Sequence, residues 1–147
     1  MNILDTGTLA RGIAGTPRAM LTFPAPLALA NGALLATLRA GSTKDAADEA
    51  IELYRSDDAG RSWRMLRRLR FDGALGGARG TLKVCYLTEI APGRLLAAAM
   101  WVDRTTYPGQ PLFNPATCSL PSRSALSWSS LVLTGRYSTG LPVSFAR

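Results

Sequence analysis

One short segment, residues 56–63, constrains the fold more than any other part of the sequence. It reads Ser-Asp-Asp-Ala-Gly-Arg-Ser-Trp. Short Ser and Asp side chains hydrogen-bond nearby backbone amides and favour a tight turn. Gly60 can adopt backbone conformations that other residues resist, and Trp63 brings a large ring to bury against neighbouring strands. The segment therefore predicts a turn between two strands.

Hairpin signals on both sides of this turn extend the β prediction. Asn31-Gly32 and Pro92-Gly93 each lie between apolar runs, and Asn-Gly is typical of a type I′ turn, whose two central residues need positive φ. The pattern Gly-x-Leu-Leu-Ala begins at Gly32 and again at Gly93, which suggests successive propeller blades. Further strands are expected at residues 51–55 and 63–71, where apolar and charged residues alternate. We predict an all-β chain.

The turn segment also carries a family resemblance. It fits Ser-x-Asp-x-Gly-x-Ser/Thr-Trp at all five fixed positions and resembles the Asp box, the bacterial neuraminidase repeat of sialidase-like propellers. Before it come Phe23-Pro24, a strand with a Gly turn, Arg39 and Asp45, in the order found in that family. The resemblance covers residues 20–104 and implies a β-propeller fragment of two to three antiparallel four-stranded blades. It assigns structural roles to Ser56, Asp58, Gly60, Ser62 and Trp63.

The resemblance implies glycoside hydrolysis of terminal sialic-acid-type sugars. Sialidases bind the sugar carboxylate with three arginines, because the hydrogen-bond donors of a guanidinium group match a planar anion. Arg39 resembles the second of these arginines, and Asp45 resembles the acid/base aspartate, with Asp48 as the fallback. The position of the first arginine holds Thr22, and Arg18 is a poor substitute for it.

The nucleophile of the family is a Tyr paired with a Glu. Tyr107 and Glu89 are present, but no motif places them in these roles. We therefore expect a sialidase-like chain that is inactive on its own. The alternatives are a non-catalytic Asp-box module that binds glycan or protein, and a basic nucleic-acid-binding domain.

Histidine is absent, which excludes a Ser–His–Asp triad, a Cys–His dyad and His-based zinc sites. The two cysteines, Cys85 and Cys118, lack CxxC spacing and are expected to be free buried thiols, with a disulfide as the alternative. We expect neither a metal nor a cofactor. The sequence also has no secretory signal and no apolar run of membrane-spanning length, which favours a cytoplasmic chain without a membrane partner.

Composition divides the chain into three parts. Residues 1–19 form an N-terminal arm, 20–116 hold the expected blades, and 117–147 are rich in Ser and lack acidic residues. No second Asp box follows the first, so we expect the chain to be truncated or frameshifted and to self-associate through exposed sheet edges. The alternative is a small β domain in which C-terminal strands, for example residues 126–133, cover an open edge.

The positive charge is concentrated in one stretch. The formal net charge is +7, and six arginines lie between residues 55 and 70: Arg55, Arg61, Arg64, Arg67, Arg68 and Arg70. Such a cluster could contact phosphates. The alternation in residues 63–71 favours a solvated strand face instead, and no aromatic stacking platform accompanies the charge. Nucleic acid is therefore not the expected partner.

Overall fold

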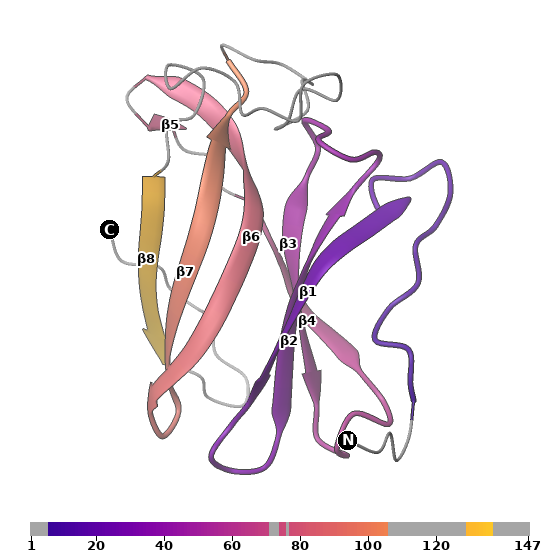
Figure 1. The fold of residues 1–147 in the computed structure, drawn as a ribbon, viewed down its shortest axis with the longest axis vertical. Helices are drawn as coiled ribbons and strands as arrows, with labels where there is room; N and C mark the ends of the chain where they lie inside the picture. The colour runs from indigo at the N-terminus through magenta and orange to yellow at the C-terminus, as the bar shows by residue number, and fades with distance from the viewer. Residues whose placement is uncertain (1–5, 71–73, 76, 106–128, 137–147) are drawn as a thin grey trace, which may run out of the picture.

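The computed structural model describes residues 6–70, 74–75, 77–105 and 129–136 as two four-stranded antiparallel sheets (Figure 1). The all-β prediction is confirmed. Tyr107 and Cys118 lie outside the described residues. The described part contains no helix with the length and apolarity needed to cross a bilayer.

Each sheet follows chain order. The first contains β1 (Met20–Ala28), β2 (Leu34–Gly41), β3 (Ala50–Ser56) and β4 (Arg64–Leu69). The second contains β5 (Ala74–Leu75), β6 (Ala78–Ala91), β7 (Arg94–Asp103) and β8 (Ser129–Arg136). The Gly-x-Leu-Leu-Ala pattern leads into β2 and β7, so β6 and β7 correspond to β1 and β2, whereas the two-residue β5 has no counterpart.

The hairpin predicted at Asn31-Gly32 joins β1 to β2, but its turn type is not the expected one. Gly32 has φ 84°, whereas Asn31 is not among the residues with positive φ, so the turn is not type I′. The amide of Gly32 donates to the carbonyl of Leu29, and the amide of Leu29 donates to Ala33, both at 2.9 Å. This pattern fits a three-residue loop with a left-handed glycine. The second predicted hairpin, at Pro92-Gly93, joins β6 to β7 with Gly93 at φ 71°.

The main core lies between the two sheets, which stand side by side in Figure 1. Alternate residues of β2 and β3, including Leu35, Ile51 and Leu53, face the second sheet. They meet Leu95 and Trp101, among other residues of β6 and β7. Because strand side chains alternate between faces, Arg39 points to the same side as Ile51.

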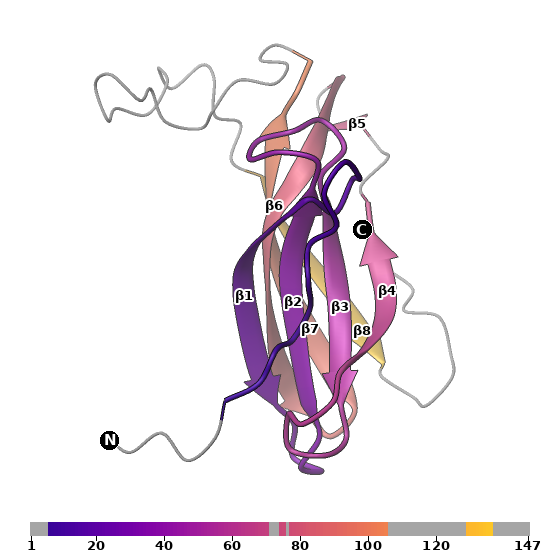
Figure 2. The ribbon, with the colours of Figure 1, turned by 90° about the vertical axis from the view of Figure 1, so that its right-hand side faces the viewer.

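The N-terminal arm covers the other face of the first sheet, along β2 and β3 (Figure 2). Leu9 and Ala10 of the arm pack near Tyr54, which is buried. Arg18 donates to both oxygens of Glu52, at 2.7 and 3.1 Å, and to the Tyr54 hydroxyl at 2.9 Å. Burial, followed by the hydrogen bond to Glu52, raises the pKa of Tyr54 to about 12. Both faces of β2 and β3 are therefore covered.

β8 belongs to the segment 117–147 and pairs with β7 along its whole length. The edge of β7 therefore has a partner strand, close to the position 126–133 at which an edge-covering strand was considered. Cys85, on β6, is a buried free thiol, and burial raises its pKa to about 11.

Candidate functional site

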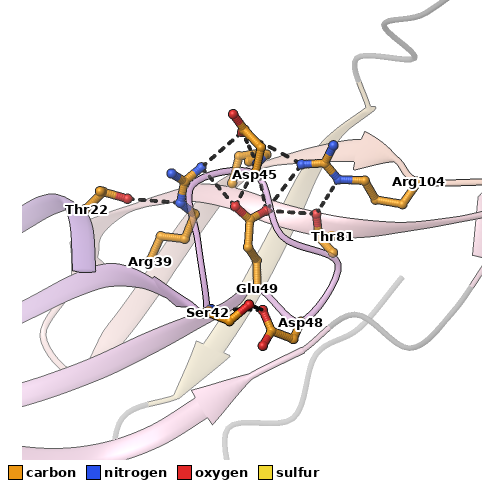
Figure 3. Close-up of polar contacts among 9 residues, drawn as sticks. Thr22, Arg39, Ser42, Asp45, Asp48, Glu49, Thr81 and Arg104 are labelled. Atoms are coloured by element: carbon orange, nitrogen blue, oxygen red, sulfur yellow. Dashed lines mark hydrogen bonds and ion pairs between the residues drawn. The ribbon is translucent and has the colours of Figure 1, made fainter. Parts of the chain in front are cut away.

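A cluster of charged side chains lies where the loop between β2 and β3 meets the second sheet (Figure 3). Arg39 comes from β2, and the loop of residues 42–49 supplies Asp45 and Glu49. β6 supplies Lys83 and Thr81, and Arg104 directly follows β7. All six residues are buried, so these groups interact largely without water.

Lys83, on β6, connects the second sheet to the loop of the first. Its Nζ lies 2.5 Å from Asp45 Oδ1 and 2.8 Å from Glu49 Oε1, and its side chain is fully buried. Thr81 Oγ1 donates to the other Glu49 oxygen at 3.1 Å. These contacts bridge the loop to β6, and they hold both carboxylates beside a buried cation.

The Arg39 guanidinium has unused hydrogen-bonding capacity. Its Nε donates to Thr22 Oγ1 at 2.9 Å, and the Phe23 ring lies 4.8 Å from its central carbon. The two terminal nitrogens are buried and make no hydrogen bond within the described part of the chain. One of them lies 3.3 Å from Glu49 and 3.8 Å from Asp45, at ion-pair distance only. Such unsatisfied donors are uncommon in protein interiors.

Oppositely charged groups face each other in the cluster. Arg39, Lys83 and Arg104 supply three positive charges, and Asp45 and Glu49 supply two negative charges. Burial lowers the pKa of Lys83, although its hydrogen bonds to the two carboxylates oppose this. Burial alone would raise the pKa of Asp45, but Lys83 and the two arginines lower it below its ordinary value. Asp45 is therefore held as a carboxylate, which can accept a proton but has none to donate.

The structure brings together Arg39 and Asp45, two of the three site residues proposed from the sequence. Thr22, at the position where the resemblance expects an arginine, is the cross-strand partner of Arg39. Asp48, the fallback, is turned away from the cluster and accepts hydrogen bonds from the amide and hydroxyl of Ser42, at 3.0 and 3.1 Å. In this arrangement Asp48 stabilises the loop.

Two further candidates lie away from the cluster. Arg18 pairs with Glu52 on the arm-covered face of the first sheet, opposite to Arg39. Glu89 lies near the hairpin turns and accepts hydrogen bonds from the amides of Ala30 and Gly93, at 2.7 and 3.0 Å. These bonds lower the pKa of Glu89. Neither residue contacts Asp45 or Arg39 in the described structure.

Sequence reasoning missed Glu49, Thr81, Lys83 and Arg104. The one available signal was at Lys83, a charged residue in a strand between the apolar Leu82 and Val84. Glu49 directly precedes β3, and no local sequence pattern singles it out.

The turn at residues 56–63 joins β3 to β4 through side-chain hydrogen bonds. Asp58 Oδ1 accepts from the Ser56 hydroxyl at 2.7 Å and from the Ser62 amide at 2.9 Å. The Ser56 hydroxyl also accepts from the Gly60 amide at 2.8 Å, and Gly60 has φ 88°. The Trp63 indole donates to the Gly60 carbonyl at 3.0 Å. The turn is therefore closed by its own residues.

The pH dependence of stability should reveal the Asp58 charge. Hydrogen bonds from Ser62 and Ser56 lower the pKa of Asp58 to about 2 from 3.8. The ionised Asp58 side chain therefore stabilises the fold fully above pH 3.8, and this stabilisation is lost as the pH falls toward 2. We expect the melting temperature of Asp58→Asn to lie well below that of the wild type at pH 7, and the difference to narrow near pH 2. A difference that stays constant over this range would contradict a stabilising role for the charge.

The arginine-rich stretch divides into exposed and buried members. Arg61, Arg64, Arg67 and Arg70 are exposed, and Arg68 is half-buried and donates to the Pro17 carbonyl at 2.8 Å. Arg55, on β3, is buried and its Nε donates to Asp57 at 2.6 Å. In the segment 63–71, the predicted solvated face therefore holds for Arg64, Arg67 and Arg70 and only in part for Arg68.

Within the residues that the structure describes, no cluster of three or more acidic or thiol side chains could hold a metal ion. The charged cluster around Arg39, Lys83 and Arg104 instead offers guanidinium and ammonium groups, which bind anions. Comparisons with protein-family models, with curated proteins and with solved structures find no match to this chain.

Proposed function

We propose that this chain is a sialidase-like propeller unit that binds a carboxylate-bearing sugar through Arg39 and does not hydrolyse it alone. The observation that carries the proposal is the buried Arg39 guanidinium, whose two terminal nitrogens make no hydrogen bond in the described structure. A sugar carboxylate could accept both donors in a bidentate pair.

The arrangement around Arg39 supports a sialidase-like origin. Thr22, Arg39 and Asp45 lie together at the sheet whose β3–β4 turn has the Asp-box sequence. The four-stranded antiparallel order of that sheet also fits a propeller blade. The lowered pKa of Asp45 argues against hydrolysis, because a general acid must be protonated near the working pH.

Binding of N-acetylneuraminate, followed by calorimetry, tests the proposal. Arg39→Lys keeps the charge but loses the planar fork, so we expect binding about 10- to 100-fold weaker, the equivalent of about 1.5–3 kcal/mol. Arg70→Lys, at an exposed position, is the matched control and should bind like the wild type. The methyl ester of the sugar, which lacks the negative charge, should bind weakly to all three proteins.

The turnover of a fluorogenic sialoside separates this proposal from the enzymatic one. We expect no release of the fluorophore by the wild type. Release that disappears in Asp45→Asn would instead favour the hydrolase. Absence of sugar binding in the wild type and in Asp45→Asn, with both chains folded, would overturn the binding proposal.

The exposed arginines give the nucleic-acid hypothesis its own readout, since phosphate contacts make DNA affinity fall steeply with salt. A DNA affinity that does not change with salt would remove that hypothesis.

Self-association through exposed sheet edges stays a prediction.

A further inference from the structure

Asp45 faces all three cations of the cluster from the side of the loop. Its Oδ1 is 2.5 Å from Lys83 Nζ, 3.8 Å from an Arg39 terminal nitrogen and 3.8 Å from an Arg104 terminal nitrogen. A carboxylate from a ligand would be attracted to the same point by the same three groups. Asp45 and the ligand would therefore compete for one position.

The two carboxylates of the cluster are held differently. Glu49 directly precedes β3, has a fully buried side chain and also accepts from Thr81. Asp45 lies within the loop, where its φ of 69° is in the left-handed region that few non-glycine residues adopt. Figure 3 shows Glu49 in the middle of the cluster and Asp45 at its edge. Asp45 is thus the carboxylate that a movement of the loop could withdraw.

The loop between β2 and β3 also blocks the access of a ligand to Arg39 in this structure. Arg39 is 2% exposed and Asp45 is 3% exposed, so a ligand cannot reach the guanidinium while residues 42–49 keep this position. The contacts of Ser42 with Asp48 lie within the loop and could move with it. Opening would break the ion pairs of Asp45 and leave Glu49 bound to Lys83.

We propose that Asp45 is an internal competitor: its carboxylate occupies the site of the ligand's carboxylate, and binding requires residues 42–48 of the loop to withdraw it, while Glu49 stays in place. This inference rests on the proposed function and adds a regulatory role for Asp45. The apparent affinity is reduced by the fraction of molecules in which the loop is open. Asp45 then opposes binding, whereas a residue that contacts the sugar directly would promote it.

The variant Asp45→Asn tests this inference with N-acetylneuraminate as the probe. Asparagine keeps the size of the side chain and tolerates left-handed φ, but it removes the competing charge. If the loop is open in about 1–10% of wild-type molecules, the variant should bind about 10- to 100-fold more tightly. Asp57→Asn, the same substitution at an exposed residue of the β3–β4 turn, should bind like the wild type.

The outcomes separate the inference from the function on which it rests. Tighter binding by Asp45→Asn, or binding by this variant alone, supports the inference. Wild-type binding with equal or weaker binding by Asp45→Asn overturns the inference and leaves the proposed function standing. Absence of binding in both folded chains overturns both.

A measurement on the wild type covers the case in which Asp45→Asn does not fold. Saturating sugar should speed amide hydrogen exchange around Asp45 in the loop between β2 and β3. Exchange that slows or stays unchanged in this loop, under conditions where the sugar is bound, would overturn the inference.

Discussion

Glu49→Gln is expected to lower the free energy of unfolding by about 3–5 kcal/mol, the usual cost of removing one member of a buried ion cluster. The Glu49 side chain is fully buried and lies 2.7 Å from Lys83, 3.3 Å from Arg39 and 3.5 Å from Arg104. Glutamine keeps the shape but not the charge, so three buried cations would share the single carboxylate of Asp45. Urea unfolding of the two chains at pH 7 measures the loss.

Two further variants identify the cause of that loss. Glu89→Gln makes the same change beside the hairpin turns, where its partners are the backbone amides of Ala30 and Gly93, and should cost much less. The double variant Glu49→Gln with Lys83→Met restores the original net charge of the cluster and should recover part of the stability. Equal losses in Glu49→Gln and Glu89→Gln, or a double variant less stable than Glu49→Gln, would contradict the electrostatic explanation.

Local sequence signals predicted the strands and their connections well. The glycines at 32 and 93 have positive φ and lie in the turns of the two predicted hairpins, because the conformation that each turn needs depends on a few adjacent residues. The type of the first turn was wrong, since Asn31 does not adopt the positive φ of a type I′ turn. The three-residue loop needs only one left-handed residue, and Gly32 supplies it.

The charged cluster could be predicted only in part. Arg39 and Asp45 are separated by six positions, and the family resemblance was enough to single them out together. Lys83 is 38 positions from Asp45 in the chain and meets it only because the two sheets pack face to face. No local pattern encodes that packing, so Lys83 and Arg104 appear at the site only in three dimensions. Their presence changes the chemistry, because they keep Asp45 ionised.

The contacts of the N-terminal arm could not be predicted from local sequence patterns either. Its sequence suggested only a segment before the first strand, yet Arg18 forms a bidentate ion pair with Glu52. Glu52 lies in the alternating segment 51–55, and it is fully buried because the arm covers that face. Period-two alternation therefore identified the strand, but it gives no information on the arm that covers one of its faces.

Trp101→Ala is expected to destabilise the chain by about 3–5 kcal/mol, the usual cost of removing a buried aromatic ring. Trp101, on β7, is 1% exposed and packs in the core between the sheets with Ile51 and Leu82. The ring also lies against Gly80, where an added Cβ would come within 2.3 Å of it. Its indole nitrogen is buried without a hydrogen bond in the described structure. Trp101→Phe, which loses no such bond and keeps most of the apolar contact, should therefore cost less.

Comparing Trp63→Ala with Trp101→Ala shows which packing region stabilises the fold more. Trp63 follows the Asp-box turn and was the ring that the sequence expected to be buried, but it is half-buried, on the arm-covered face of the first sheet. Its removal loses one hydrogen bond to the Gly60 carbonyl and part of the contact with Tyr54 and its neighbours, so we expect a smaller loss than for Trp101→Ala. Denaturant unfolding of the three variants beside the wild type measures the order. If Trp63→Ala were the most damaging, the packing beneath the arm would stabilise the fold more than the packing between the sheets.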